Sequence, residues 1–298
     1  MRNSFMYSLG VVATLALVSG VAMAQNAPAG NQNRPAGAAP AGQQSNMPGR
    51  KTAQDTGGPA PMHNLDGTWI GNGESRLMTH IPEMTAAGQA KLKLNVPDPF
   101  SGSSNDPWQT CDPFGMPRVV NNEVRTIGFA TMPDRIIILE NYGKNWREVW
   151  TDGRPLPKNI GHPGGQSSRW FGYSVGHWQG DHTLVVDTTG MMPESWVDRR
   201  GYPHSVDARS IEEYDRVDHN HLNMKESIDD PAYYTQTFVI AQANYSWIAG
   251  QDDPKAGDIP FADEQVCIPS AAIEYQKLVG GAADEDATTT GAKPKNGK

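Results

Sequence analysis

The chain has 298 residues and a formal net charge of −8 at neutral pH. A length of this size allows one or two domains. The acidic balance disfavours nucleic acid and anionic membrane surfaces as partners, because both carry negative charge themselves. We therefore expect no nucleic-acid partner.

The first 24 residues have the three parts of a secretory signal peptide. Arg2 supplies the positive charge, residues 9–18 form an apolar run, and Ala22-Met23-Ala24 is a small-x-small cleavage site. The apolar run is too short for a transmembrane helix, which needs about 20 such residues. The pattern predicts cleavage near Ala24 and a periplasmic or secreted protein that does not span the membrane.

Composition divides the remaining chain into one domain and two tails. Residues 25–62 are mostly Ala, Gly, Asn, Gln and Pro, and residues 280–298 form a charged tail rich in Thr, Gly and Lys. Segments with so few large apolar side chains cannot bury enough surface to offset chain entropy. We predict a disordered linker at 25–62, a β-barrel domain at 63–279 and a disordered tail at 280–298.

Strand patterns follow one another through the domain at short intervals. Runs rich in β-branched and aromatic residues alternate with turn residues. The domain opens at residues 65–69, and the predicted strands cover residues 124–130, 135–142, 146–151, 169–178, 183–189, 208–217, 222–228, 234–241 and 245–248. Helices are predicted near the ends, at Ala86–Leu94 after the cap Thr85 and at Ala271–Val279 after Ser270. This pattern predicts an all-β fold, an antiparallel meander closed into a barrel of about 8–10 strands with short flanking helices.

Two cysteines, Cys111 and Cys267, lie near opposite ends of the domain. In an exported protein such a pair indicates a disulfide more than a metal or redox site. Two free buried thiols are the alternative. Neither cysteine has a histidine close by in the sequence, which argues against a catalytic thiol.

Two resemblances concern most of the domain. The segment Gly67-Thr68-Trp69 resembles the Gly-x-Trp start of lipocalin-type (calycin) barrels, which implies a lipocalin-like fold. Residues 65–275 are similar to a family of exported bacterial proteins of undefined function. The similarity lies in the segments CDPFGMPR, WREVWTDGR, WFGYSVGHWQGDHTLVVDTTG, PHS, EEYDRVD and DDPAYYT. It supports an exported single domain and implies no catalytic residues.

Aromatic residues concentrate between residues 145 and 190, where four of the eight tryptophans lie. Alternation along a strand puts Trp146, Glu148 and Trp150 on one face and Arg147 on the other. We favour a central cavity lined by such side chains, because barrels of about eight strands can hold one ligand. The predicted ligand-binding residues are Trp146, Arg147, Glu148, Trp150, Arg154, Trp170 and Trp178.

The arginines among these residues have two interpretations. A guanidinium group can hold a ligand carboxylate or phenolate through two parallel hydrogen bonds. In the turn Asp152-Gly153-Arg154, the alternative is a structural ion pair between the two charged side chains. Arg147 has the same two possibilities.

An acid–base site is the competing hypothesis, with His204 as its central residue. This histidine lies in a predicted loop, and imidazole titrates near neutral pH. A carboxylate of Asp187, Glu212 or Glu213 could orient it as a general base, and Tyr173 could donate a proton. The alternatives are a loop histidine bonded to backbone carbonyls and a core tyrosine with a satisfied hydroxyl.

Three functions follow from these patterns. The first is a periplasmic barrel that binds a hydrophobic, aromatic small molecule, and the second is a cofactor-independent lyase, decarboxylase or isomerase acting on an aromatic substrate. The third is a structural envelope protein. We predict no metal site, because His219, His221 and the pair Asp181-His182 lie at hairpin tips without a third ligand at a familiar spacing.

Overall fold

Nine strands close into a barrel in the computed structural model, which describes residues 52–71, 80–97, 104–121, 126–140, 145–251 and 267. The strands are β1 (Gly67–Gly71), β2 (Thr126–Thr131), β3 (Arg135–Glu140), β4 (Asn145–Trp150), β5 (Tyr173–Gln179), β6 (Thr183–Thr189), β7 (Arg209–Arg216), β8 (His221–Asp229) and β9 (Phe238–Trp247). The helices of the described ranges are α1 (Ala86–Leu92), the 3-10 helix η1 (Pro107–Thr110) and α2 (Arg118–Asn121). The prediction of an all-β barrel with short helices is confirmed.

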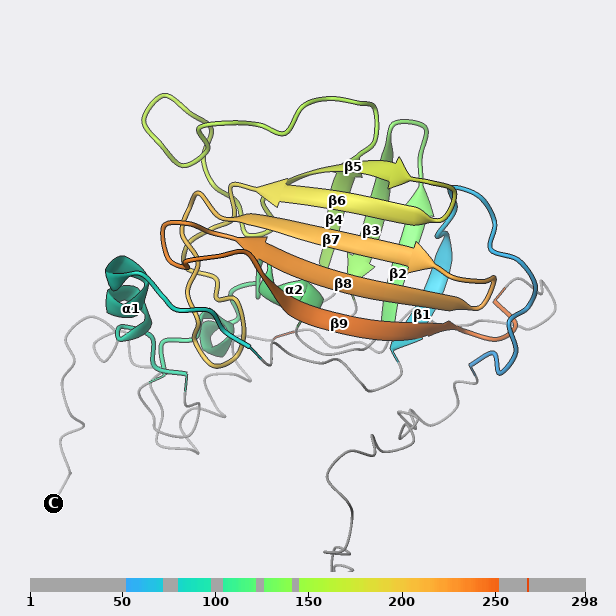
Figure 1. Cartoon of the computed structure of the whole chain (residues 1–298), viewed down its shortest axis with the longest axis horizontal. Coiled ribbons are helices and arrows are strands. Elements are labelled where there is room, and N and C mark those ends of the chain that lie inside the picture. Colours follow the sequence, from blue (N-terminus) through green and yellow to red (C-terminus); the bar gives the residue numbers. More distant parts are fainter. Residues whose placement is uncertain are drawn as a thin grey trace, which may run out of the picture. The chain divides into compact units, whose positions relative to one another are not determined.

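Each strand pairs with its neighbours along the chain, and β9 pairs with β1 to close the barrel (Figure 1). All of these pairs are antiparallel except β4 with β5, which are parallel. A parallel pair needs a long connection that brings the chain back to the same end of the sheet. Residues 151–172 form this connection, a long loop at the top of Figure 1.

Element boundaries match the prediction where local signals are unambiguous. β6 covers the predicted residues, and the hydroxyl of Thr85 caps α1 by accepting a hydrogen bond from Gly88 N at 3.1 Å. β5 begins later than predicted, because Gly172 has a φ of +63° and interrupts the extended conformation. β9 is one continuous strand where two were predicted.

Inward-facing side chains meet across the interior of the barrel. Near one end the rings of Trp69 and Trp247 lie 4.9 Å apart, edge to face, and the guanidinium of Arg216 lies over both rings. Farther along, Phe129 of β2 and Tyr214 of β7 meet edge to face at 5.2 Å. Since β2 and β7 are not neighbours in the sheet, this contact crosses the barrel.

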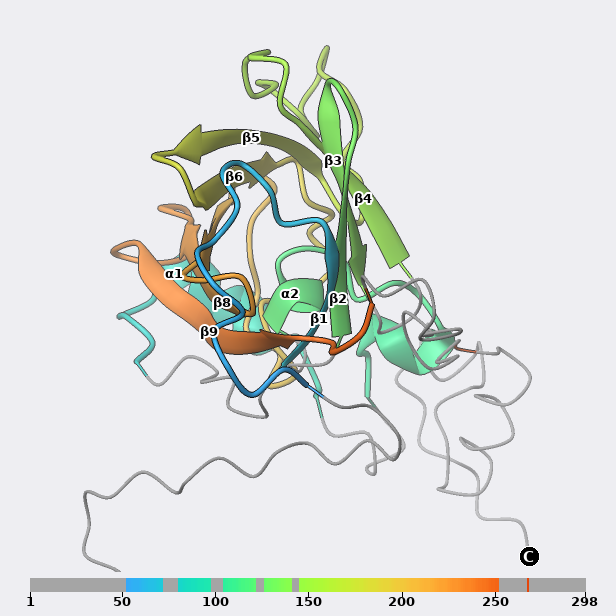
Figure 2. The same cartoon turned by 90° about the vertical axis from the view of Figure 1, so that its right-hand side faces the viewer.

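The short helices η1 and α2 follow α1 in the chain, and α2 contacts β9. Cys111 follows η1 and forms a disulfide with Cys267, with 5.4 Å between their Cα atoms, as predicted. The helix α2 lies beside β9, as Figures 1 and 2 both show, and its residues Val119 and Val120 are buried.

Several predicted segments fall outside the described residues: the signal peptide at 1–24, most of the linker at 25–62, the helix Ala271–Val279 and the tail at 280–298. The last residues of the predicted linker are described and lie against β9, where Ala53 N donates to Trp247 O at 2.9 Å. Within the described ranges, no helix has the length and hydropathy that crossing a membrane requires.

Candidate functional site

The closed barrel has its shortest strand pairing between β4 and β5. β4 pairs with β3 along all six of its residues but with β5 only at Val149 and Trp150. If the parallel register continued, residues 170–173 would lie beside residues 145–148. Instead Gly172 turns the chain, and Arg169 forms a bridge with Met191 on the far side. Residues 145–148 of β4 therefore have no partner among the described residues on the side of β5, which leaves a gap in the sheet.

A cavity of about 590 Å³ occupies this gap, and we call it the seam pocket. Its aromatic lining comes from both sides of the gap, and its charged lining includes three arginines. The lining side chains are Trp146, Arg147, Glu148, Trp150, Arg154, Pro157, Gln166, Arg169, Trp170, Phe171, Tyr173, Ser174 and Val175. Of the seven residues predicted to bind a ligand, the pocket brings six together, and Tyr173 joins them. The seventh, Trp178, is elsewhere, stacked on the ring of His63.

Two of the three arginines of the seam pocket lie over aromatic rings. Arg154 lies over the ring of Trp150 at 3.5 Å and also pairs with Asp152 at 2.6 Å, which lowers the pKa of that carboxyl group. This ion pair is the structural alternative that the sequence allowed for the turn Asp152-Gly153-Arg154. Arg169 lies over Tyr173 at 4.2 Å and has no carboxylate partner in the described part of the chain. Glu148 is bound by Arg135 at 2.6 Å.

Arg147 separates the seam pocket from a buried polar layer inside the barrel. Its guanidinium donates to both carboxylate oxygens of Glu212 on β7, through Nη1 at 2.8 Å and through Nη2. The hydroxyl of Tyr214 donates to the same carboxylate at 2.7 Å. Because β4 and β7 are not neighbours, this ion pair crosses the interior of the barrel. The seam pocket therefore lies in the wall of the barrel, outside this ion pair.

Two further glutamates lie in the polar layer without a full set of partners. Glu140 Oε1 is 3.9 Å from Arg147 Nε, too far for a hydrogen bond, and neither atom has another partner among the described residues. Burial raises the pKa of Glu140 to about 7, against the opposing effect of Arg147. Glu226 accepts a hydrogen bond from Ser210 at 2.7 Å, and burial together with the charge of Glu212 raises its pKa. Burial therefore favours the protonated form of both carboxyl groups.

His204, the residue predicted as general base, is fully buried. Its Nδ1 lies 2.9 Å from the backbone oxygen of Ser205, and its Nε2 lies 2.7 Å from the hydroxyl of Ser195. Burial lowers the pKa of its imidazole. These partners match the alternative of a loop histidine bonded to the backbone.

The other residues of the acid–base hypothesis have separate partners. Asp187 pairs with Arg209, and Glu213 pairs with Lys225, both on the outer side of the sheet. The hydroxyl of Tyr173 donates to the backbone oxygen of Ser167 at 3.0 Å. Within the described part of the chain, no hydrogen bond or ion pair joins any of these three residues to His204, so the four do not form one site.

Sequence reasoning missed several residues of this region. Arg169 and Phe171 were not selected, although they belong to the same aromatic run as Trp170. Glu140 and Glu226 were not selected either. Their signal was a charged residue at an inward position of an alternating strand, IIILE in β3 and HLNMKESID in β8. That signal is ambiguous, since the outward positions of β7 and β8 are charged as well.

Comparisons with known proteins add no relative: no protein-family model, curated protein or solved structure matches this chain.

Proposed function

We propose that this protein binds a small aromatic molecule carrying a negative charge, and that it does so in the seam pocket. One observation carries the proposal. Residues that are far apart in sequence, from Trp146 to Tyr173, line one cavity of about 590 Å³, a volume typical of small-molecule sites.

The lining suits a flat, apolar ligand. Aromatic rings from both sides of the gap offer stacking surfaces, and such pairs add about 0.5–1.5 kcal/mol each beyond area burial. Trp146 is 59% exposed, unusual for a tryptophan, and this exposed ring leaves apolar surface that a ligand would cover.

The charges of the pocket favour an anion. Glu148 is neutralised by Arg135, Arg154 is paired with Asp152, and Arg147 is paired with Glu212. Arg169 has no such partner among the described residues, so its guanidinium can receive a carboxylate, sulfonate or phenolate.

The binding function is better supported than acid–base catalysis. His204 is buried with its ring nitrogens bonded, whereas the aromatic residues chosen for binding share one cavity. Export is proposed along with binding, and the disulfide between Cys111 and Cys267 supports an oxidising compartment.

The probe 8-anilinonaphthalene-1-sulfonate tests the proposal, because it is aromatic and anionic and fluoresces in apolar sites. It should bind the folded protein, and Trp146→Ala should weaken binding by roughly tenfold, since one stacked ring contributes about 0.5–1.5 kcal/mol plus its buried area. Arg169→Ala should weaken it similarly. Trp178→Ala, outside the pocket, is the matched control and should bind as the wild type does. Equal losses in the variant and the control would contradict the proposal.

A further inference from the structure

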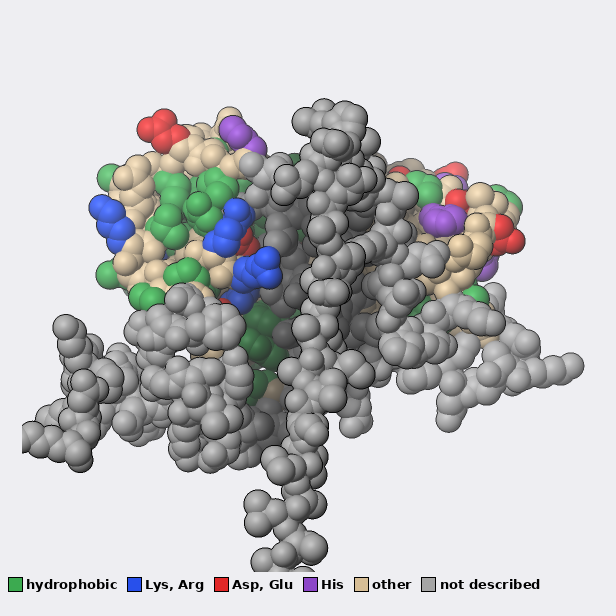
Figure 3. Space-filling model, turned by 90° about the horizontal axis from the view of Figure 1, so that it is seen from below, with side chains coloured by type: hydrophobic (Ala, Val, Ile, Leu, Met, Phe, Trp, Pro, Cys, Tyr) green, Lys and Arg blue, Asp and Glu red, His purple; other side chains and the backbone are tan. Residues whose placement is uncertain are grey.

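A second cavity, of about 330 Å³, lies on the other side of Trp170, between α1 and η1. Its lining includes Lys91, Asn95, Ser104, Thr110, Trp170 and Glu194. We call it the polar pocket. Figure 3, seen from below, shows hydrophobic surface beside Lys and Arg side chains on the left, the side on which Figure 1 places α1.

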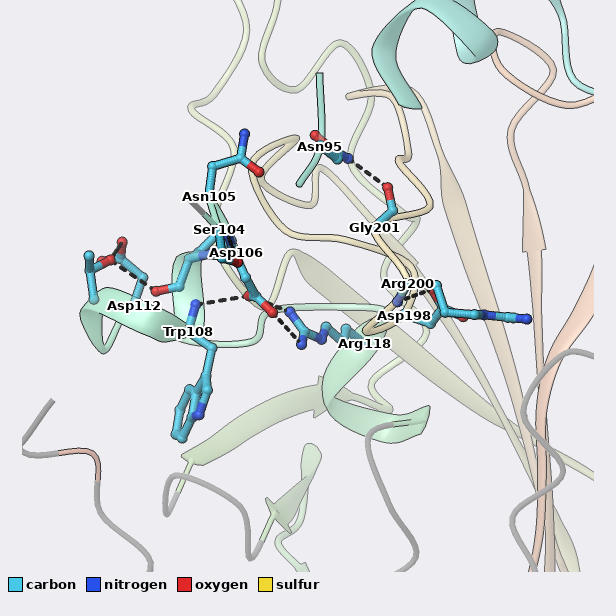
Figure 4. A network of polar contacts seen from close by, with 12 residues as sticks. Asn95, Ser104, Asn105, Asp106, Trp108, Asp112, Arg118, Asp198, Arg200 and Gly201 are labelled. Carbon is cyan, nitrogen blue, oxygen red and sulfur yellow. Dashed lines mark hydrogen bonds and ion pairs between the residues drawn. The ribbon is translucent and has the colours of Figure 1, made fainter. Parts of the chain in front are cut away.

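The floor of the polar pocket is a fixed hydrogen-bond network, shown in Figure 4. The carboxylate of Asp106, only 6% exposed, accepts two hydrogen bonds from Arg118, at 2.7 and 2.8 Å, and one from Trp108 N at 3.0 Å. Asn95 Nδ2 donates to the backbone oxygen of Gly201 at 2.7 Å. Ser104 Oγ donates to a backbone oxygen at 2.9 Å. These bonds hold the wall in place before any ligand arrives, which lowers the entropic cost of binding.

The rim of the pocket carries polar groups that the protein leaves unused. The ammonium of Lys91 and the carboxylate of Glu194 have no ion pair or hydrogen bond in the described part of the chain. The side-chain oxygen of Asn95 also has no partner there. The hydroxyl of Thr110 can donate to Pro107 O at 3.0 Å or to Asp112 Oδ2 at 3.2 Å, and it keeps lone pairs for accepting a further bond.

We propose that the polar pocket binds one pyranose-type sugar unit. Each sugar hydroxyl both donates and accepts, so one ring can accept from Lys91 and donate to Glu194 and to the Asn95 oxygen. The C–H face of the same ring can pack on the half-buried indole of Trp170. A purely apolar ligand would leave these polar groups without partners. Asp106 is neutralised by Arg118, so a simple anion would meet the carboxylates of Glu194 and Asp112, and a simple cation would meet Lys91.

This proposal is independent of the seam pocket, apart from the shared Trp170. The two cavities have different linings. The seam pocket has three arginines and several aromatic rings, whereas the polar pocket has amides, hydroxyl groups, the ammonium of Lys91 and the carboxylates of Asp106, Asp112 and Glu194. If no sugar binds, the proposal of an aromatic ligand in the seam pocket still stands. If no aromatic ligand binds there, the sugar proposal still stands.

Saturation-transfer NMR and calorimetry on the full chain can test it, with methyl α-glucoside, methyl β-galactoside and N-acetylglucosamine as probes and alanine as a zwitterionic comparison. At least one sugar should bind at millimolar concentration. Glu194→Ala and Lys91→Ala should each weaken that sugar by roughly tenfold or more, as expected for hydrogen bonds to charged groups. Lys93→Ala, an exposed lysine at the end of the same helix, is the matched control and should bind normally.

Glu194 is exposed, so its removal should not unfold the protein, and an unchanged melting temperature verifies this. The proposal is overturned if no sugar binds, if binding survives both substitutions, or if alanine binds in place of the sugars.

Discussion

Replacing Glu140 by glutamine tests the buried polar layer through its protons. The folded protein raises the pKa of Glu140 from 4.5 to about 7, chiefly through burial. Below pH 4.5 this carboxyl group is protonated in both the folded and the unfolded state. As the pH rises from 4.5 towards 7, the unfolded chain releases the proton first, so the folded state binds more protons and the free energy of unfolding falls.

The size of the effect follows from the difference of about 2.5 pKa units. At 1.36 kcal/mol per unit, Glu140 destabilises the wild type at pH 8 by roughly 3 kcal/mol relative to acid pH. Glutamine has the shape of the protonated acid and carries no charge. The Glu140→Gln variant should therefore be more stable than the wild type at pH 8, by an amount up to roughly this value, and the gain should shrink to about 1 kcal/mol or less at pH 5.

Urea unfolding of both proteins at a series of pH values from 5 to 8 measures this difference. Glu213→Gln is the matched control, because that glutamate lies on the outer side of β7 beside Lys225, and it should keep the pH dependence of the wild type. A Glu140→Gln variant that is less stable than the wild type at pH 8 would refute the reasoning. It would mean that the ionised carboxylate is well paired by Arg147.

Three further predictions concern the stability of the fold, at His204, at the disulfide and at Gly172. Burial lowers the pKa of His204, so below about pH 6.5 the unfolded chain binds protons in preference to the folded one. The free energy of unfolding of the wild type should therefore fall as the pH drops below this value. Urea titrations should show a smaller fall for His204→Asn. Reducing the disulfide, or changing Cys111 to Ser, should lower the free energy of unfolding by about 5 kcal/mol, because the bond closes a loop of 156 residues and so limits the entropy of the unfolded chain. Denaturation with and without reductant measures this difference. A change under 1 kcal/mol would contradict the prediction. Gly172→Ala should lower the melting temperature more than Gly180→Ala does. Both glycines have a positive φ, but only at Gly172 would an added Cβ meet neighbouring atoms, at 2.7 Å. Equal decreases in melting temperature would show that the backbone conformation alone matters.

The sequence predicts those parts of the fold that depend on local signals. The run Thr183–Thr189 is a strand because its β-branched residues lie between two turns, and Thr85 caps α1 because a hydroxyl can satisfy the first free backbone groups. β9 was predicted as two strands, 234–241 and 245–248, and the residues left between them include Gln242 and Asn244. Both side chains are exposed and alternate with buried Ala243 and Tyr245, which is the pattern of a half-buried strand.

The candidate site was predictable in its residues but not in its position. Six of the seven residues selected from the sequence after Asn145 line one cavity, whereas Trp178 lies elsewhere and Arg169 was not selected. Alternation placed Trp146 opposite Arg147 correctly, but it cannot say which face points inward when both carry large groups. The parallel pairing of β4 with β5 depends on how a long loop folds back, and the ion pair of Arg147 with Glu212 joins strands that are distant in the sequence. Neither the parallel pairing nor this ion pair can be predicted from neighbouring residues in the sequence.

The indole N–H spectrum of the protein, recorded with and without 8-anilinonaphthalene-1-sulfonate, tests the location of the ligand most directly. Each tryptophan gives one signal, which single Trp→Phe substitutions can assign. The signals of Trp146, Trp150 and Trp170 should move on binding, while those of Trp69 and Trp247, buried inside the barrel, should stay in place. Movement of the Trp69 and Trp247 signals alone would place the ligand in the interior and contradict the seam pocket.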